Sequence, residues 1–517
     1  METDPVFLSR RRGARGRGRP APPPVVRRLR SGLSRETFLS GDGRGDPDRV
    51  GADRVSGNRG DRGGVTASKR ALAGFLSLVA AGLAVSCSVS KRPARPGARD
   101  RASLAARVRE ELVFSWRAYE RYAWGHDELK PLTRAPRDWY GSESLLLTPV
   151  DSLDTLLLMG LAEDADKART LIVDQLSFDK DVSVKNFEIT IRLLGGLLSA
   201  YEMTGDARLL ELADDLGTRL LPAFESPTGM PYMFVNLKTG RTSGARSNPA
   251  EIGTLVLEFG TLARLANKPV YFQKAKKALV ALFERRSKIG LVGEEIDVAS
   301  HVGGGIDSYY EYLVKCAALF GDLDCGRMAR ESLRALNDRL ADDSGNGLWY
   351  GQVDMTTGER TATEFGALHA FLPAVLVLAG DLGRARHLQE SCFRMWTLRG
   401  IEPEVLDYRT MQVTSPGYPL RPEIVESAYY LYSSTKDPKY LDMGRAIFEA
   451  LVARCRTDSG YTVLKNVVTG EKGDLMPSYF LAETLKYLYL LFAPEGTLDL
   501  EKVVFNTEAH PFRRRAP

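Results

Sequence analysis

The chain has 517 residues, of which 44% are hydrophobic and 26% are charged, and its formal net charge is +5. This composition is ordinary for a globular protein and is sufficient for a large buried core. The positive charge belongs to the N-terminal end, because residues 1–64 hold 15 Arg against 8 acidic residues. The remainder is slightly acidic, so net charge gives no reason to expect a nucleic-acid partner for the folded part.

Residues 1–68 are rich in Arg, Gly and Pro, and they contain no Lys. Such a segment cannot bury enough apolar surface to fold, so we expect it to be disordered. A basic arm that binds nucleic acid is the alternative. The absence of Lys favours GC-rich upstream DNA translated from a mis-assigned start codon.

Residues 69–87 are predicted to be a signal peptide. Two basic residues precede an apolar run from Ala71 to Val85, which suits a signal-peptide core and is short for a membrane span. Cys87 follows small residues, as in a bacterial lipoprotein signal; a plain cleaved signal and an uncleaved anchor are the alternatives. We therefore expect export to a bacterial periplasm or outer membrane, rather than to a eukaryotic secretory pathway, with membrane attachment through this segment.

Residues 88–100 are predicted to be a linker, and residues 101–517 the folded catalytic domain. In that domain apolar residues recur at spacings of three and four, which indicates helices rather than strands. The predicted helices cover residues 103–121, 151–163, 187–204, 207–223, 250–266, 270–285, 307–319, 326–340, 362–379, 382–398, 422–435, 438–454 and 477–492.

Several of these helices are joined by turns of one kind. Each turn ends one helix and supplies an Asp that can cap the next, as in "MTGDARLLELA", "FGDLDCGRMA", "AGDLGRARHL" and "TKDPKYLDMG". Recurring helical hairpins are the signature of a repeat architecture, which is either an open solenoid or a closed α/α barrel. The longer connections, rich in Gly, Pro and Tyr, lie at the same end of the hairpins, where a pocket on one barrel face would form.

The folded part contains four cysteines, at Cys316, Cys325, Cys392 and Cys455. None has the spacing of a Cys- and His-based metal site. They could pair after export, but isolated buried thiols are the favoured prediction.

Acidic residues occur in apolar helices and at helix starts. Each has a structural explanation, as an anion at a helix start or as half of a buried ion pair. The set is less easily explained, because buried Glu is rare unless it is paired or functional. The residues are Glu188 with Arg192 four positions later, Asp307, Glu423 and Glu426 after Arg421, Glu483, and Thr507 with Glu508 and His510 near the C-terminus.

Carboxyl groups beside tyrosines suit glycoside hydrolysis, which needs one protonated carboxyl and one carboxylate. Clustered carboxylates with a Thr hydroxyl also suit a hard cation that prefers oxygen ligands. The chain has no phosphate-binding glycine motif, no GxSxG and only five His. Phosphate-loop and Ser–His–Asp chemistry are therefore not expected.

Six segments in chain order resemble the class I α-1,2-mannosidases, glycoside hydrolase family 47. They are "TPVDSLDTLLLMGL", "NFEITIRLLGGLLSAYEMTGD", "GIDSYYEYLVK", "YPLRPEIVESAYYLYSSTKDPKYL", "YFLAETLKYLYLLF" and "VFNTEAHPF". The stretches "SPTGMPYMFVNL", "RRSKIGLVGEEIDV" and "GYPLRPEIVESAYYLY" most resemble the branch of degradation-enhancing α-mannosidase-like proteins. The resemblance implies an all-α, (α/α)7 barrel of helical hairpins, with a C-terminal hairpin that plugs the barrel.

The resemblance also implies a function, an inverting exo-α-1,2-mannosidase that removes terminal mannose from high-mannose glycans, glycoproteins or related mannosides with the help of Ca²⁺. Glu188 and Asp307 are both candidates for the proton donor, and Glu423 matches the base that activates water. The implied substrate-binding residues are Arg192, Arg421 and Tyr479. The implied calcium ligands are Thr507, directly, and Glu426, Glu483 and Glu508, through water. A mannose-binding or glycoprotein-binding protein with little turnover is the alternative.

Three departures from the family pattern stand out. The family's "HLVCFLPG" appears here as "ALHAFLPA", so Ala367 replaces a His and Ala370 replaces a disulfide Cys. The family disulfide should therefore be absent, with Cys392 near the partner position. Tyr479 stands where the family usually has Phe, and it should still stack under a sugar ring. The first two departures bear on linkage specificity more than on the chemistry.

Overall fold

The computed structural model describes residues 98–514 except residues 142, 295–298 and 344. The predictions for residues 1–68 and 69–87, and most of the predicted linker, lie outside the described residues. Helix α1 begins at Ala98, inside the stretch predicted as a linker. Among the described residues, no helix combines the length and apolar character needed to cross a bilayer.

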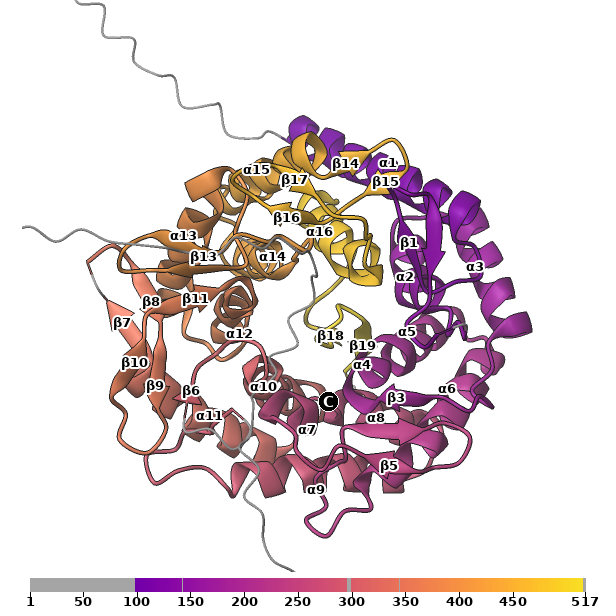
Figure 1. Cartoon of the computed structure of the whole chain (residues 1–517), viewed down its shortest axis with the longest axis horizontal. Coiled ribbons are helices and arrows are strands. Elements are labelled where there is room, and N and C mark those ends of the chain that lie inside the picture. The colour runs from indigo at the N-terminus through magenta and orange to yellow at the C-terminus, as the bar shows by residue number, and fades with distance from the viewer. Residues whose placement is uncertain (1–97, 142, 295–298, 344, 515–517) are drawn as a thin grey trace, which may run out of the picture. The chain divides into compact units, whose positions relative to one another are not determined.

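The helices form two concentric rings, and the chain alternates between them (Figure 1). The outer ring contains α1 (Ala98–Tyr122), α3 (Ala162–Gln175), α6 (Ala207–Leu220), α9 (Val270–Phe283), α11 (Leu323–Arg339), α13 (Leu382–Arg399) and α15 (Lys439–Arg454). The inner ring contains α2 (Leu147–Leu158), α5 (Gly195–Thr204), α8 (Val256–Leu265), α10 (Asp307–Phe320), α12 (Leu372–Leu378), α14 (Glu423–Thr435) and α16 (Leu485–Phe492). Each inner helix contacts the next, and α16 returns to α1. This arrangement confirms the predicted (α/α)7 barrel.

Short helical segments directly precede several inner helices in the chain. α4 (Asn186–Ile189) and the π-helical turn η1 (Thr190–Leu194) lead into α5, and the π-helical turn η4 (Phe480–Thr484) leads into α16. α7 (Pro249–Gly253) precedes α8, and η3 (Ala367–Phe371) precedes α12. The short η2 (Leu221–Phe224) follows α6.

The two rings differ in composition because they are buried differently. α6 of the outer ring buries Leu209, Ala213, Leu216 and Leu220, spaced by three and four, and is amphipathic. α10 of the inner ring is buried almost throughout, since it lies between the outer ring and the barrel axis. A helix buried on all sides is apolar on all sides, so any charged residue in it needs an explanation.

The predicted Asp caps explain how three outer helices begin. Asp206, Asp322 and Asp381 are the N-cap residues of α6, α11 and α13, and each side chain accepts a backbone N–H of the first turn. The fourth turn differs slightly, because α15 begins after Pro438 while Asp437 accepts the N–H of Lys439 at 3.0 Å. The outer helix α3 was not predicted, since only two of its five buried side chains are large and apolar: Leu171 and Ile172, beside Asp164, Ala165 and Ala168.

Short antiparallel strands, which the sequence did not predict, join the hairpins. The two-stranded pairs are β1 (Glu128–Lys130) with β2 (Ala135–Arg137), β7 (Ala341–Asp343) with β8 (Leu348–Tyr350), β14 (Arg456–Thr457) with β15 (Gly460–Tyr461), and β16 (Leu464–Asn466) with β17 (Glu471–Lys472). The three-stranded sheets are β3 (Ser183–Lys185), β4 (Phe234–Asn236) and β5 (Thr242–Ser243); β6 (Ala299–Ser300), β9 (Gln352–Asp354) and β10 (Arg360–Ala362); and β11 (Glu364–Gly366), β12 (Val405–Asp407) and β13 (Gln412–Ser415).

A C-terminal hairpin enters the barrel. β18 (Val503–Phe505) pairs with β19 (Pro511–Arg513), and the turn between them contains residues 506–510. β18 contacts α10 and β19 contacts α5, both in the inner ring. We call residues 503–513 the plug. Its position confirms the predicted C-terminal hairpin inside the barrel.

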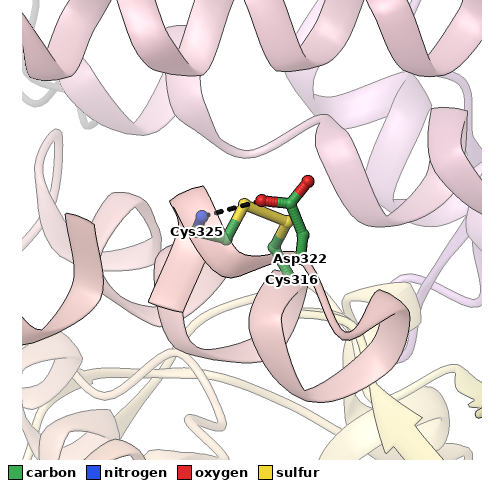
Figure 2. Close-up of side chains that lie close together, drawn as sticks. All are labelled: Cys316, Asp322 and Cys325. Atoms are coloured by element: carbon green, nitrogen blue, oxygen red, sulfur yellow. Dashed lines mark hydrogen bonds between the residues drawn. A yellow bond between two sulfur atoms is a disulfide. The ribbon is translucent and has the colours of Figure 1, made fainter. Parts of the chain in front are cut away.

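The prediction of isolated thiols is wrong for two of the four cysteines. Cys316 near the end of α10 and Cys325 in the first turn of α11 form a disulfide, with Cα atoms 5.9 Å apart (Figure 2). The tight turn between the helices brings the two sulfurs together, which sequence spacing alone did not reveal. Cys392 and Cys455 are buried free thiols, as predicted, so the family disulfide at Ala370 is absent.

Candidate functional site

A cavity of about 270 Å³ lies on the inner ring, and all ten predicted site residues line it. The ten come from five separate parts of the chain. They are Glu188, Arg192, Asp307, Arg421, Glu423, Glu426, Tyr479, Glu483, Thr507 and Glu508. The fold therefore brings together residues that are up to about three hundred positions apart in the sequence.

Helix starts and π-helical turns place these side chains. Asp307 is the first residue of α10, and Glu423 is the first residue of α14. A helix N-terminus carries partial positive charge, which favours carboxylates at both positions. Arg192 lies in η1 and Glu483 in η4. A π-helical turn inserts an extra residue into a helix and is frequent at functional sites.

Asp307 and Glu423 share a wall of the cavity. Burial raises the pKa of Asp307 to about 7, despite the backbone N–H of Ser308 that its carboxylate accepts at 2.8 Å. Burial also raises the pKa of Glu423 to about 7, against the lowering effect of Arg421. One carboxylate oxygen of Glu423, Oε2, is buried and has no hydrogen-bond partner among the described residues. Two carboxyls that titrate near neutrality can supply one acid and one base.

Glu426 in α14 and Glu483 in η4 also line the cavity. Burial raises the pKa of Glu426 to about 8, although Lys315 approaches within 3.8 Å and Tyr487 donates a hydrogen bond at 3.2 Å. Burial and the charge of Glu508 together raise the pKa of Glu483 well above its ordinary value. Such a cluster of like charges favours either protonation or a bound cation.

Arg192 connects the cavity wall to the plug. Its guanidinium donates to one carboxylate oxygen of Glu188, Oε2, at 3.1 and 3.2 Å, and it also donates to Glu508. The same guanidinium lies over the rings of Trp139 and Tyr479, at 5.4 and 5.5 Å. Arg192 therefore fixes Glu188 and Glu508 relative to each other.

Arg421 and Tyr479 form another part of the wall. Arg421 pairs with Glu404 at 2.6 Å, and the hydroxyl of Tyr479 donates to the carbonyl of Pro419 at 2.6 Å. These contacts orient the guanidinium of Arg421 and the ring of Tyr479. An oriented aromatic ring at a cavity wall can stack against a sugar face.

Charges beneath the cavity hold the plug in place. The imidazole of His510 lies 2.8 Å from Asp154 and 3.1 Å from Asp151, and Lys486 pairs with Asp154 at 2.8 Å. All four side chains are fully buried. Burial alone would raise the pKa of Asp154, but Lys486 and His510 lower it to about 2. Asp154 is therefore a structural anion.

Asn506 fixes the plug turn. Its side-chain amide donates to the carbonyl of Ile191 at 2.9 Å and to Glu258 at 2.8 Å. Its side-chain oxygen accepts the backbone N–H groups of Glu508 and His510. Both the nitrogen and the oxygen of the Asn506 side chain therefore have hydrogen-bond partners. These bonds fix the backbone on both sides of Thr507. The hydroxyl of Thr507 itself has no hydrogen-bond partner in the part of the chain that the structure describes.

Apart from Ser308, which directly follows Asp307, the sequence did not identify four further polar residues that line the cavity. Glu311 lies one turn after Asp307 and pairs with the buried Lys315. Lys185 pairs with Glu251, and Asn248 caps the helical turn that carries Glu251. The four-residue spacing of Asp307 and Glu311 could have indicated Glu311. Nothing in the sequence signals Lys185, Glu251 or Asn248, because strand β3 and helix α7 meet only in the fold.

The oxygen atoms that line the cavity are the kind of ligand that a hard divalent cation prefers. Eight acidic and three basic side chains among the described residues line the cavity. Within the described residues, Cys316, Asp322 and Cys325 form the only group whose three candidate ligand atoms converge on one point, and there the two sulfurs bond to each other (Figure 2). The cavity acids are thus too dispersed for three of them to bind one ion directly. Their excess negative charge and the unpartnered Thr507 hydroxyl fit a hydrated cation.

Comparisons with known proteins agree with this site. Residues 111–514 match the model of glycosyl hydrolase family 47. An α-mannosidase I of Arabidopsis thaliana is 37% identical over 79% of this chain and 76% of its own length. The ER degradation-enhancing α-mannosidase-like protein 2 of Homo sapiens is 36% identical over 80% of this chain and 78% of its own length.

A solved structure gives the same result. The α-1,2-mannosidase from Trichoderma reesei is 30% identical, with a TM-score of 0.74, over 80% of this chain and 99% of that one. The family model covers residues 111–514, and the relatives and the solved structure each cover about four-fifths of the chain. The chain therefore belongs to glycosyl hydrolase family 47 and is a glycoside hydrolase.

Proposed function

We propose that this protein is an exo-acting α-1,2-mannosidase that removes terminal mannose from mannosyl-oligosaccharides with inversion and with the help of Ca²⁺. The observation that carries the proposal is the convergence of Asp307, Glu188 and Glu423 on one small cavity. Relatives named as α-1,2-mannosidases and mannosyl-oligosaccharide 1,2-α-mannosidases support the substrate class.

In this proposal Glu423 is the base. Its carboxylate takes a proton from the attacking water, and its unpartnered Oε2 is available for that contact. Glu188 or Asp307 supplies the proton to the leaving oxygen on the opposite face. An inverting mechanism needs room for water between base and sugar, with the two carboxyls roughly 6.5–9.5 Å apart.

Ca²⁺ is assigned to the part of the cavity that Thr507 lines. Thr507 would hold it directly, and Glu426, Glu483 and Glu508 would hold its waters. A bound divalent cation would hold mannose hydroxyl oxygens and lower the pKa of a nearby water. Tyr479 stacks under the ring, while Arg192 and Arg421 keep Glu188 and the surrounding acids in position.

The proposal is tested with α-1,2-linked mannobiose and residues 1–517 produced as the full chain. We expect release of mannose that stops when a chelator is added and returns when Ca²⁺ is restored. The α-1,3- and α-1,6-linked mannobioses should be cleaved much more slowly. Tight binding of mannobiose without release would instead support the mannose-binding alternative, and release that resists chelation would remove the role of Ca²⁺.

We also propose that the protein is exported. The Cys316–Cys325 disulfide supports this proposal, since disulfides persist in oxidising compartments. N-terminal sequencing of the protein from its native cells tests it: a mature chain that begins at or after Cys87 is expected, and a chain that retains residues 69–87 in the cytoplasm would contradict it.

A further inference from the structure

The turn that leads into α10 lies at the cavity wall, and two histidines outside the set assigned to catalysis and metal binding contact it. Gly304 and Gly305 of this turn line the cavity. The carbonyl oxygen of Gly303 accepts the backbone N–H groups of Ile306 and Asp307, both at 3.0 Å. Because Asp307 is the first residue of α10, the position of Gly303 determines where the carboxyl of Asp307 lies.

His301 bonds to this turn through one ring nitrogen. Its Nδ1 accepts the backbone N–H of Gly303 at 3.1 Å, and its Nε2 lies 3.1 Å from Oε2 of Glu294. Because Nδ1 accepts, the proton of the neutral ring is on Nε2, which donates to Glu294. The side chain of His301 is only 12% exposed. Glu294 therefore orients the ring, and the ring in turn holds Gly303.

His369 in η3 packs against the same glycine. A Cβ atom added at Gly303 would lie 2.6 Å from Nδ1 of His369, so the imidazole occupies the space beside the glycine. Nδ1 of His369 accepts the backbone N–H of Gly366 at 3.1 Å. Burial lowers the pKa of His369 to about 3, so the ring stays neutral and Nδ1 stays an acceptor. The rings of His301 and His369 are stacked, with their centroids 6.1 Å apart.

Ordinary core packing is the alternative explanation for the two rings. The ring of Phe365 lies 4.7 Å from that of His369, and an apolar side chain could fill the same space. An apolar side chain could not accept the N–H groups of Gly303 and Gly366. A buried N–H group without an acceptor costs about 1–3 kcal/mol, so these bonds hold the two segments that meet at Gly303, residues 301–306 and 366–371.

We propose that His301 and His369 are positioning residues that hold the turn at Gly303 and thereby fix the carboxyl of Asp307 for catalysis. This inference rests on the proposed function, in which Asp307 is one of the two candidate proton donors. A shift of about 1 Å in a reacting group can lower a rate by about 10²-fold, so the start of α10 must be fixed. Neither histidine is among the described residues that line the cavity, so we expect neither to contact the sugar.

The test exchanges each histidine for two amides of different length. The oxygen of Asn can replace the accepting Nδ1 of His, whereas the longer amide of Gln extends toward the position of Nε2. His301→Gln should lower kcat on α-1,2-mannobiose by about 10- to 100-fold with little change in KM, because the N–H of Gly303 loses its acceptor. His301→Asn should keep most of kcat. His369→Gln and His369→Asn should differ in the same direction.

Hydrogen–deuterium exchange of the full chain gives a readout that needs no activity. The backbone N–H groups of Gly303 and Asp307 should exchange about 10-fold faster in His301→Gln than in the unmodified protein, and His301→Asn should restore slow exchange. His387→Gln is the matched control, since the side chain of His387 on α13 is exposed. It should change neither the exchange rates nor kcat.

Three results would overturn the inference: equal kcat in His301→Gln and His301→Asn, a raised KM with unchanged kcat, or unchanged exchange at Gly303. Failure of the proposed function looks different, since the unmodified protein would then cleave no mannobiose while the exchange rates would still respond to His301→Gln. Thermal melting separates a local change at Gly303 from a loss of folding. If His301→Gln does not fold, the comparison of His369→Gln with His369→Asn decides in its place.

Discussion

Two groups of buried acids in this barrel have pKa values that are shifted in opposite directions. Where the plug meets the inner ring, Asp154 is paired with Lys486 and with His510 of the plug, and these partners lower its pKa to about 2. In the cavity wall, burial raises the pKa values of Asp307 and Glu423 to about 7. Burial is common to both groups, so the difference comes from the partners.

The comparison separates structural acids from reactive ones. An acid with a buried cation beside it stays ionised and ties elements together. An acid buried without such a partner has a pKa raised toward neutral pH, as Asp307 and Glu423 have. Its burial lowers the stability of the fold, and acids with such shifted pKa values cluster at functional sites. Removing a wall acid should therefore abolish activity and spare the fold, whereas removing a paired acid should do the reverse.

The largest expected effect comes from Glu423→Gln. Loss of a general base should lower kcat on α-1,2-mannobiose by about 10²–10⁴-fold. The melting temperature should stay the same or rise, because the raised pKa of Glu423 means that its buried charge opposes folding above pH 7. Activity assays and thermal melting of the same preparation measure both. Full activity in this variant would show that another residue is the base.

Asp154→Asn tests the paired group. It leaves the buried Lys486 and His510 without their shared partner, and we expect a loss of about 3–5 kcal/mol in the free energy of unfolding at pH 7. The sign follows from the lowered pKa: the contribution of Asp154 is present above pH 3.8 and is lost as the pH falls toward 2. Denaturant titration measures it. Asp166→Asn, which removes an exposed partner of Arg169, is the control and should cost less than about 1 kcal/mol.

Thr507→Val probes the calcium site without changing side-chain volume. Removing the hydroxyl should weaken Ca²⁺ binding by about 10²-fold or more, since even indirect ligand contacts are worth 10- to 100-fold. Calorimetric titration of Ca²⁺ into the chelator-treated full chain measures the affinity. Thr497→Val, outside the cavity, should leave that affinity intact. An unchanged affinity in Thr507→Val would place the ion elsewhere.

Gly195→Ala tests whether close packing holds the plug. A Cβ atom at Gly195 would lie 2.7 Å from the side-chain nitrogen of Asn506 and 2.9 Å from His510. We expect a loss of about 1–3 kcal/mol in stability, together with weaker Ca²⁺ binding. Gly383→Ala in α13 meets nothing within 4 Å and should stabilise the protein slightly. Similar stability in both variants would mean that the plug tolerates displacement.

The pH dependence of kcat/KM gives the smallest effect and distinguishes the two candidate acids. Glu423 must be ionised, so activity should fall as the pH drops below about 7. If Asp307 is the donor, it must be protonated, and activity should also fall above about 7. Asp307→Asn would then remove the alkaline limb from the residual activity. If Glu188→Gln removes that limb instead, Glu188 is the donor.

Local patterns predicted the helical hairpins but left an open solenoid as the alternative; the closed barrel and the residues of its floor were expected from the resemblance to the family. Helical periodicity and Asp caps define the hairpins, and the six family-like segments contain the ten cavity residues. The plug was likewise expected from the resemblance to the family. The short strands escaped prediction, since segments of two to four residues carry too little periodicity.

Contacts between distant segments could not be predicted in this way. The pairing of Lys185 with Glu251 depends on strand β3 meeting helix α7, and nothing in either segment signals it. The disulfide between Cys316 and Cys325 depends on the tight geometry of one hairpin turn. Likewise, the pKa differences between Asp154 and Asp307 arise from partners that only the folded chain supplies.

The most direct test is to follow α-1,2-mannobiose cleavage by proton NMR and to identify the first anomer of mannose that appears. Water activated by Glu423 on the face opposite the leaving oxygen gives β-mannose first, with α-mannose growing only by mutarotation. Initial release of α-mannose would mean that a carboxylate attacks the sugar itself, and the division of roles between Glu423 and the two candidate acids would then be wrong.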